Sequence, residues 1–176
     1  MSTFITSDLH LGHKSLAIDY RGFSTIEEHD ITIIKNWKKV VHKRDKVYVL
    51  GDITMENHEY YPLLDKLNGY IVVIGGNHDL EKDILHLNKY VEKVVGCVSY
   101  KKFILTHIPV HPSQISHKII GNIHGHMHKK RVLDSRYFNA CLDLNDYTPI
   151  NFDYIKEVFK NGNPLPNICG IPSEDQ

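Results

Sequence analysis

The stretch Tyr70-Ile-Val-Val-Ile-Gly-Gly-Asn-His-Asp79 decides the fold class of this 176-residue chain. Its first five residues are β-forming, which predicts a buried strand. Gly75-Gly76 ends that strand, and the polar side chains of Asn77, His78 and Asp79 follow at once. A helix is expected next, over residues 79–90. Strand, polar loop and helix in this order are typical of a βαβ unit, so the stretch predicts an α/β fold.

The same pattern occurs earlier in the chain. Thr3 to Ser7 is a short β-forming run that stops at Asp8, and Val47 to Leu50 is a second run that stops at Gly51-Asp52. Between them, Thr25 to Glu28 has the spacing of a capping box, and apolar residues recur at helical intervals as far as position 41. A short helix is expected over residues 63–67. These elements extend the predicted alternation of strands and helices.

The second half of the chain is predicted to hold a hairpin, two more strands and a final helix. Val94 to Tyr100 and Phe103 to Thr106 flank Lys101-Lys102, and two residues are too few for a parallel crossover. Strands are expected at residues 119–123 and 137–144, and a helix at 151–160. We expect residues 1–160 to form a single domain and residues 161–176 an extended tail.

The composition limits the partners of the chain. Its 21 basic and 21 acidic residues balance, so there is no global attraction to nucleic acid or an anionic membrane. The three cysteines form no CxxC pair, which fits a reducing compartment. No segment approaches the roughly 18 uninterrupted apolar residues of a membrane span. We expect a soluble, cytoplasmic protein with no membrane partner and no obligate protein partner.

Metal-type side chains stand at the ends of the predicted strands. His124-Gly-His-Met-His128 places three imidazoles within five residues, and for this cluster alone a solvated patch is a fair alternative. Ligands of open α/β sheets bind beyond the carboxyl ends of the strands. The other strand-end residues are also carboxylates, imidazoles or a carboxamide: Asp8, His10, Asp52, Asn77, His78 and His107. So many coincidences are hard to assign to turns, and we predict a metal site.

This donor set suits two ions. Mixed Asp and His ligands favour Mn²⁺, Fe²⁺ or Zn²⁺, whereas an all-oxygen set favours Mg²⁺ or Ca²⁺. About seven ligands are too many for one ion and suffice for two if one carboxylate bridges them. Paired ions roughly 3.5 to 4 Å apart clamp phosphoryl oxygens and activate a water for in-line attack. The expected substrate is a phosphate ester, either a phosphorylated small molecule or a nucleotide or nucleic acid.

The order of these blocks resembles the calcineurin-like metallophosphoesterases. The matching blocks are Asp8-x-His10, Gly51-Asp52, Gly76-Asn77-His78-Asp79, His107 and Gly125-His126-x-His128, and the match runs from Asp8 to about Asp146. The chain looks most like the small single-domain phosphoesterases of bacteria and phages. The resemblance implies a four-layer αββα sandwich, in which two mixed sheets pack face to face with flanking helices.

The resemblance also implies a ligand set and a leaving-group residue. Asp8, His10 and His128 would hold the first ion, Asn77, His107 and His126 the second, and Asp52 would bridge both. The cofactors would be two divalent ions, with Mn²⁺ as the first expectation and Fe²⁺, Zn²⁺, Ni²⁺ or Mg²⁺ as alternatives. His78 would protonate the leaving oxygen or stabilise charge in the transition state. Asp79 would orient or charge His78, with a helix N-cap as its alternative role.

Three further residues are candidates near the site. His13 and Arg21 are expected to hold the substrate phosphate, with an ordinary surface position as the alternative. His124 falls outside the ligand pattern and is expected to support a ligand by hydrogen bonding. We expect hydrolysis of phosphodiesters first and phosphomonoesters next, without a covalent intermediate. The alternatives are a nuclease or cyclic-nucleotide phosphodiesterase on the same site, and a non-catalytic scaffold protein on the same fold.

Overall fold

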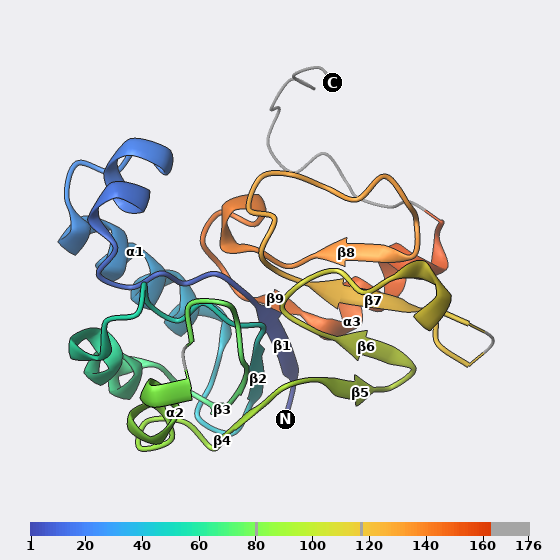
Figure 1. Cartoon of the computed structure of the whole chain (residues 1–176), viewed down its shortest axis with the longest axis horizontal. Coiled ribbons are helices and arrows are strands. Elements are labelled where there is room, and N and C mark those ends of the chain that lie inside the picture. The colour runs from blue at the N-terminus through green and yellow to red at the C-terminus, as the bar shows by residue number, and fades with distance from the viewer. Residues whose placement is uncertain (80, 117, 163–176) are drawn as a thin grey trace.

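The computed structural model describes residues 1–79, 81–116 and 118–162, and it contains two β-sheets with helices on the outside (Figure 1). One sheet has five strands in the order β4-β3-β2-β1-β9. These are β1 (Thr3–Thr6), β2 (Lys46–Val49), β3 (Tyr70–Ile74), β4 (Lys93–Val95) and β9 (Ile150–Asn151). Strands β1 to β4 are parallel, and β9 is antiparallel to β1. From residue 163 on, the predicted tail lies outside the described residues.

The other sheet has four strands in the order β5-β6-β7-β8. These are β5 (Val98–Tyr100), β6 (Phe103–Leu105), β7 (Gly121–His124) and β8 (Tyr137–Asn139). Strand β5 pairs antiparallel with β6 across the expected hairpin, while β6, β7 and β8 are parallel. Both sheets are therefore mixed, and the predicted α/β class of two sheets with flanking helices is confirmed.

Alternate residues of the central strands face two different apolar clusters, because successive side chains of a strand point to opposite faces. Val47 and Val49 of β2 pack with Trp37 of helix α1 (Ile26–Val40). Tyr48, between them, joins the cluster that holds Phe103 of the other sheet. The outer face of the five-stranded sheet is covered by α1, the 3-10 helix η2 (His58–Lys66) and α2 (Glu81–Leu87). The second cluster contains residues of both sheets and of the C-terminal helix.

Helix α3 (Phe152–Lys160) packs against the four-stranded sheet. The Phe103 ring lies 5.6 Å from that of Phe152 and 4.9 Å from that of Phe159, measured between ring centroids. Asn151 begins this helix by accepting a hydrogen bond from the backbone N–H of Asp153. The predicted helix over residues 151–160 is thereby confirmed. Three short helices complete the chain: η1 (Leu16–Tyr20), η3 (Pro112–Gln114) and η4 (Leu142–Leu144).

The capping box that was predicted for the long helix is present. The Thr25 hydroxyl accepts from the Glu28 backbone N–H at 3.1 Å, and the Glu28 carboxylate accepts from the Ser24 N–H at 2.9 Å. The first contact satisfies an N–H group that a helix start leaves without an intrahelical partner, and the second ties the residue before the N-cap to the first turn. In the described part of the chain, no helix is both long enough and apolar enough to cross a membrane.

One predicted strand proves to be two. Residues 94–100 read as a single β-forming run, but β4 ends at Val95 in one sheet and β5 begins at Val98 in the other. Gly96 and Cys97 carry the chain between the sheets. The prediction was wrong because apolar periodicity reports burial, and both strands are partly buried, whereas it carries no information on the sheet to which a strand belongs.

Other boundaries also differ from the predictions. The strand expected over 137–144 ends at Asn139, after which Cys141 pairs with Ser7 as an isolated bridge and η4 follows. The helix expected over 63–67 is the 3-10 helix over 58–66, and the one expected over 79–90 is the shorter α2. Strand β9 was not predicted, since two residues are too few to show a period.

Candidate metal centre

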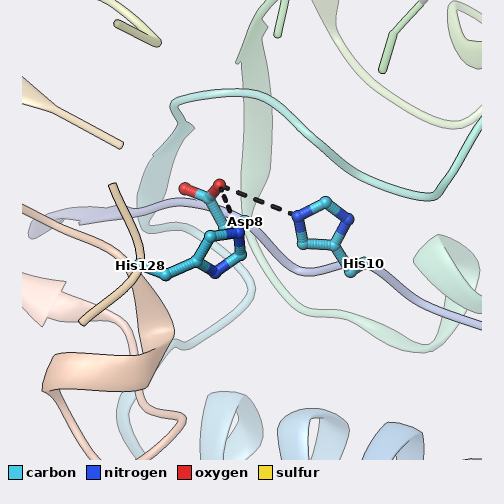
Figure 2. Close-up of side chains that lie close together, drawn as sticks. All are labelled: Asp8, His10 and His128. Atoms are coloured by element: carbon cyan, nitrogen blue, oxygen red, sulfur yellow. Dashed lines mark ion pairs between the residues drawn. The ribbon is translucent and has the colours of Figure 1, made fainter. Parts of the chain in front are cut away.

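Asp8, His10 and His128 form one cluster of metal-type side chains (Figure 2). Asp8 and His10 follow strand β1, and His128 follows β7. The Nε2 atoms of His10 and His128 lie 3.7 and 3.9 Å from the same oxygen, Oδ1 of Asp8. The two imidazole rings stack with centroids 5.3 Å apart. We call these three residues the first group.

The second group consists of Asp52, His107 and His126, which again offer one ligand atom each within a small volume. Asp52 follows β2, His107 follows β6, and His126 follows β7. Asn77, after β3, completes this group. Its Oδ1 lies 2.8 Å from His107 Nε2 and 2.9 Å from His126 Nδ1. Asp52 and Asn77 stand at the carboxyl ends of strands of the five-stranded sheet, and His107 and His126 at those of the four-stranded sheet. The two carboxyl edges meet at this group.

Asp52 links the two groups through a single atom. Its Oδ2 lies 3.6 Å from His10 Nε2 and 3.5 Å from His107 Nε2. Its Oδ1 points elsewhere and accepts a hydrogen bond from the backbone N–H of His78 at 3.0 Å. One carboxylate oxygen therefore faces both groups.

Most of the side-chain atoms that face one another in the two groups carry a lone pair and no hydrogen. His107 Nδ1 donates to the Leu50 carbonyl at 2.7 Å, which leaves a lone pair on Nε2, yet Nε2 lies 2.8 Å from the Asn77 carbonyl oxygen. Asp8 Oδ1 and both ring nitrogens of His10 are buried without any hydrogen-bond partner. Buried polar atoms of this kind lower the stability of the fold unless they gain a hydrogen bond or another polar partner.

Bound cations would satisfy these atoms. Ligand atoms about 2.1 Å from an ion, in tetrahedral or octahedral geometry, lie roughly 3.0 to 3.4 Å from one another. Contacts across the centre run from 2.8 Å, between His107 Nε2 and Asn77 Oδ1, to 3.9 Å, between His128 Nε2 and Asp8 Oδ1. Donor types, spacing and unsatisfied atoms thus all fit two divalent ions.

Backbone strain is concentrated at the same positions. Ten described residues other than glycine have a positive φ, and five of them are candidate ligands, with φ between 48° and 68°. These five are Asp8, His10, Asp52, His126 and His128. A non-glycine residue in a sparsely populated backbone region costs on the order of 1–3 kcal/mol and persists only where its surroundings fix it. Such strain is typical of functional sites.

Asp143 fixes the orientation of His128 and was not predicted from the sequence. His128 Nδ1 donates to Asp143 Oδ2 at 3.1 Å, which leaves Nε2 free to face Asp8. Burial lowers the pKa of His128, but the hydrogen bond and charge of Asp143 outweigh it and raise that pKa above its usual value. For Asp143 itself, burial opposes ionisation, yet His128 and Arg21 hold the pKa of its carboxyl well below the usual range.

Arg21 is part of this support and does not contact the surface. Its guanidinium has no exposed area and donates to both carboxylate oxygens of Asp143, at 3.0 and 2.9 Å. It also donates to the carbonyls of Asp8, at 2.7 Å, and Leu9, at 3.1 Å. The expectation that Arg21 holds a substrate phosphate therefore does not fit its position. Arg21 instead ties the strained turn at Asp8 to Asp143.

Asp79 joins two ligand-bearing loops. Its Oδ2 accepts from the backbone N–H groups of Asp52, at 2.8 Å, and Gly76, at 2.9 Å, while its Oδ1 accepts from that of Ile53, at 3.1 Å. Burial raises the pKa of the Asp79 carboxyl above its usual value, against the effect of these three donors. These bonds hold the loop after β2 against the loop after β3. They differ from both roles expected of Asp79, which were a contact with His78 and a helix N-cap.

His78 lies above the centre with its side chain 24% exposed. Its ring centroid is 5.9 Å from that of His10. His78 Nδ1 lies 3.3 Å from an oxygen of Glu56, which leaves Nε2 for another partner. Glu56 was not predicted, because a glutamate inside a loop gives no signal in the sequence.

His13 and His124 occupy different environments. The half-buried His13 ring lies 5.8 Å from the His10 ring, and burial, together with nearby histidines and Arg21, lowers its pKa. His124 is fully buried, and burial lowers its pKa to about 4. Its Nδ1 donates to the Gly125 carbonyl at 2.8 Å. His124 thus remains neutral beneath the turn and supports that turn rather than a ligand side chain.

Gly125 allows the turn to approach Asp8. A Cβ atom at this position would collide with the Ser7 hydroxyl and lie 2.6 Å from Asp8 Oδ2. Asp8 Oδ2 also accepts hydrogen bonds from the His126 N–H at 2.9 Å and the Cys141 thiol at 3.0 Å. Burial opposes ionisation of Asp8, but the neighbouring side chains of His10, Cys141 and Ser7 hold the pKa of Asp8 well below its usual range.

Comparison with known proteins places the chain in a family. No protein-family model matches it. Among solved structures, the protein of unknown function AQ665 from Aquifex aeolicus aligns with a TM-score of 0.72 and 24% identity, over 89% of this chain and 98% of its own, and so shares the fold. An archaeal phosphodiesterase aligns with a TM-score of 0.47 and 22% identity, over 79% of this chain and 82% of its own. That likeness is too distant to say anything about activity.

The sequence relationship is stronger. The uncharacterized protein MJ1445 of Methanocaldococcus jannaschii is 33% identical over 180 residues, which cover 94% of this chain and 95% of that protein. The match therefore extends over both proteins rather than over one motif. The chain belongs to the same family as MJ1445.

Proposed function

We propose that this protein is a metal-dependent phosphoesterase of the calcineurin-like metallophosphoesterase type, with phosphodiesters as its first substrates and phosphomonoesters next. The observation that carries the proposal is the position of Asp52, whose Oδ2 faces both His10 and His107 at 3.6 and 3.5 Å. Two ligand groups joined by one carboxylate are the arrangement that two-metal hydrolysis of phosphate esters requires.

The proposed ligand sets follow the two groups. Asp8, His10 and His128 would hold the first ion, Asn77, His107 and His126 would hold the second, and Asp52 would serve both. Mixed oxygen and nitrogen ligands favour Mn²⁺, with Fe²⁺, Zn²⁺, Ni²⁺ or Mg²⁺ as alternatives. Two bound ions would neutralise charge on the phosphoryl oxygens and activate a water for in-line attack.

His78 supplies the proton for the leaving group in this proposal. Its Nδ1 is turned to Glu56, so Nε2 is the atom that can donate to the departing ester oxygen. The carboxylate of Glu56 orients the ring through its contact with Nδ1. The water oxygen forms a new bond to phosphorus and gives up a proton to solvent, while the phosphorus–oxygen bond to the leaving alcohol breaks. The alcohol leaves with the proton from His78, which then takes up a proton from solvent.

Metal removal and replacement test the proposal. The protein is stripped with a chelator, supplied with Mn²⁺, and assayed on bis(p-nitrophenyl) phosphate and p-nitrophenyl phosphate, while bound metal is measured per chain. We expect two ions per chain and hydrolysis that depends on them, faster on the diester. Occupancy of none or one in excess Mn²⁺ would contradict the two-metal centre. Hydrolysis that survives complete metal removal would contradict metal dependence.

A further inference from the structure

A cleft of about 870 Å³ opens beside the metal centre. His126 and His128 form part of its wall, and each belongs to a different group. Leu16, Tyr20 and Met127 line it as well, so much of its surface is apolar. Its volume falls within the roughly 300–1,000 Å³ that is usual for small-molecule sites. The cleft therefore has room for a sizeable group attached to a phosphate that is held at the centre.

A second cleft, of about 540 Å³, opens beside Asn77 and His107. Pro109 lines both clefts, and the two ligand histidines that belong to them, His107 and His126, approach within 3.2 Å of each other. A phosphomonoester carries one substituent on its phosphate, and a phosphodiester carries two. Two clefts that meet at one centre offer a place for each substituent of a diester.

We propose that the larger cleft binds the nucleoside of a nucleoside phosphodiester substrate, an inference that rests on the proposed function. Leu16, Tyr20 and Met127 provide apolar surface for the flat face of a base, and a methionine adapts its shape to what it contacts. Asp19 and Lys130 line the same cleft and meet the polar edges of base and sugar. An aliphatic substituent would remove these two charged groups from water without offering hydrogen bonds in return.

The wall of the cleft is formed before any ligand arrives. Leu16 and Tyr20 lie on η1, a single π-helical turn in which the Arg21 N–H donates to the Leu16 carbonyl, five residues back, at 2.9 Å. Such turns are rare and are frequently found at functional sites. Tyr20 is held in place, because the Lys129 ammonium lies 4.6 Å from its ring centroid and the His128 ring lies 5.4 Å away. A preformed wall loses little conformational entropy on binding.

Two diesters with the same leaving group isolate the contribution of the cleft. Thymidine 5′-p-nitrophenyl phosphate and methyl p-nitrophenyl phosphate both release p-nitrophenolate, and they differ only in the group that stays on phosphorus. With the Mn²⁺-loaded protein, we expect kcat/KM to be about tenfold higher for the nucleoside ester, the discrimination that a few apolar contacts give. Binding of thymidine 5′-monophosphate and methyl phosphate, measured by calorimetry, should show the same preference.

Removal of the apolar side chains should abolish that preference. In Leu16→Ala/Met127→Ala, the ratio of kcat/KM between the two esters is expected to fall about tenfold, with bound metal unchanged. Leu133→Ala is the matched control, because Leu133 is fully exposed and lines neither cleft; it should keep the wild-type ratio. A thermal melt of each variant verifies that it is folded.

The outcomes separate this inference from the proposed function. Equal kcat/KM for both esters, together with equal binding of the two monoesters, would overturn the nucleoside cleft and leave metal-dependent hydrolysis standing. A ratio that stays high in the double variant would also overturn it. Absence of turnover on both esters, and on p-nitrophenyl phosphate as well, would overturn the proposed function; a retained binding preference for thymidine 5′-monophosphate would then still support the cleft.

Discussion

The Asp143 carboxylate accepts a hydrogen bond from His128 Nδ1 at 3.1 Å and so determines which nitrogen of that ring faces Asp8. The same carboxylate pairs with the buried guanidinium of Arg21. A ligand histidine is thus oriented by an aspartate that itself touches no other candidate ligand in the described residues. Partners of this kind are worth 10- to 100-fold in metal affinity.

Asp143→Asn should weaken the first metal position and leave the second intact. We expect one ion to be held as in the wild type and the other about 10- to 100-fold more weakly, because a neutral amide orients His128 poorly. Titration of the metal-free protein with Mn²⁺ measures this. Asp134→Asn is the control, since Asp134 also pairs with an arginine, Arg136, but on the surface. Two equally tight ions in Asp143→Asn would contradict the assignment.

The same carboxylate predicts a pH dependence of stability. The pKa of Asp143 is lower in the folded protein than its ordinary value of about 3.9, so its stabilising effect is present above that value. The effect is lost as pH falls towards the folded pKa. The difference in unfolding free energy between wild type and Asp143→Asn should therefore be full at pH 7 and narrow below about pH 4. Denaturant unfolding at both pH values measures this difference in unfolding free energy. A difference that is larger below pH 4 than at pH 7 would contradict the prediction.

Asp52→Asn should remove both ions and the activity together, because one oxygen of Asp52 faces both groups. We expect fewer than one tightly held ion per chain and a loss of hydrolysis of about 10²- to 10³-fold, the scale on which loss of a major electrostatic contact acts. Asp45→Asn serves as a control, since Asp45 is also buried but bonds to the backbone of Ser2 and His42. Wild-type metal content in Asp52→Asn would show that the bridge is wrongly placed.

His78→Ala should keep both ions and lose rate according to the leaving group. Without the proton from Nε2, an alkyl ester is expected to react about 10²- to 10⁴-fold more slowly, whereas an activated aryl ester should lose far less. His42→Ala provides the comparison, because the His42 side chain is 81% exposed and belongs to neither group. An equal loss on both esters would argue against a general-acid role.

Asp79→Ala should lower stability more than a surface change would. Three backbone N–H groups lose a buried acceptor, and each unsatisfied donor costs about 1–3 kcal/mol. For a chain of this size, each 1 kcal/mol lowers Tm by roughly 2–4 °C. Calorimetry should therefore show a drop of at least about 6 °C. An unchanged Tm with a loss of rate would instead support the catalytic role that the sequence suggests for Asp79.

Gly125→Ala should weaken metal binding because of a steric clash, without removing any ligand. The added methyl group would collide with Ser7 and press on Asp8 Oδ2, and the tight turn has little room to move. Gly96→Ala is the matched control, because a Cβ there has nothing within 4 Å. We expect weaker Mn²⁺ binding and a lower Tm for the first variant and neither for the second. Equal behaviour of the two would mean that the close approach at Gly125 does not matter.

Several features were readable from the sequence because they depend on neighbouring residues. A strand buried on both faces reads as an apolar run, so the positions at which Asp8, Asp52 and Asn77 leave their strands were visible. Parallel strands of one sheet share a carboxyl edge, which places Asp8, Asp52 and Asn77 side by side. His107 and His126 come from the carboxyl edge of the other sheet. The same reasoning gave the α/β class, and the spacing of Thr25 and Glu28 gave the capping box. The division of the histidine cluster between two groups was implied by the resemblance to the calcineurin-like metallophosphoesterases.

The roles of the supporting residues depended on contacts between distant segments. Arg21 meets Asp143 across 122 positions, and the His126 N–H meets Asp8 across 118. The sequence pattern of an arginine near a phosphate site does not show whether its side chain faces the substrate or the core. Asp79 beside a histidine likewise reads the same whether it contacts that histidine or the backbone.

The sequence by itself thus determined which donor side chains stand at the ends of the strands, since that order follows from local burial patterns. Only the tertiary structure decided that β4 and β5 belong to different sheets, that Asp143 orients His128, and that clefts flank the centre. The physical reason is that burial leaves a periodic trace along a strand or helix, whereas the direction in which a polar side chain points is set by partners far away in the chain.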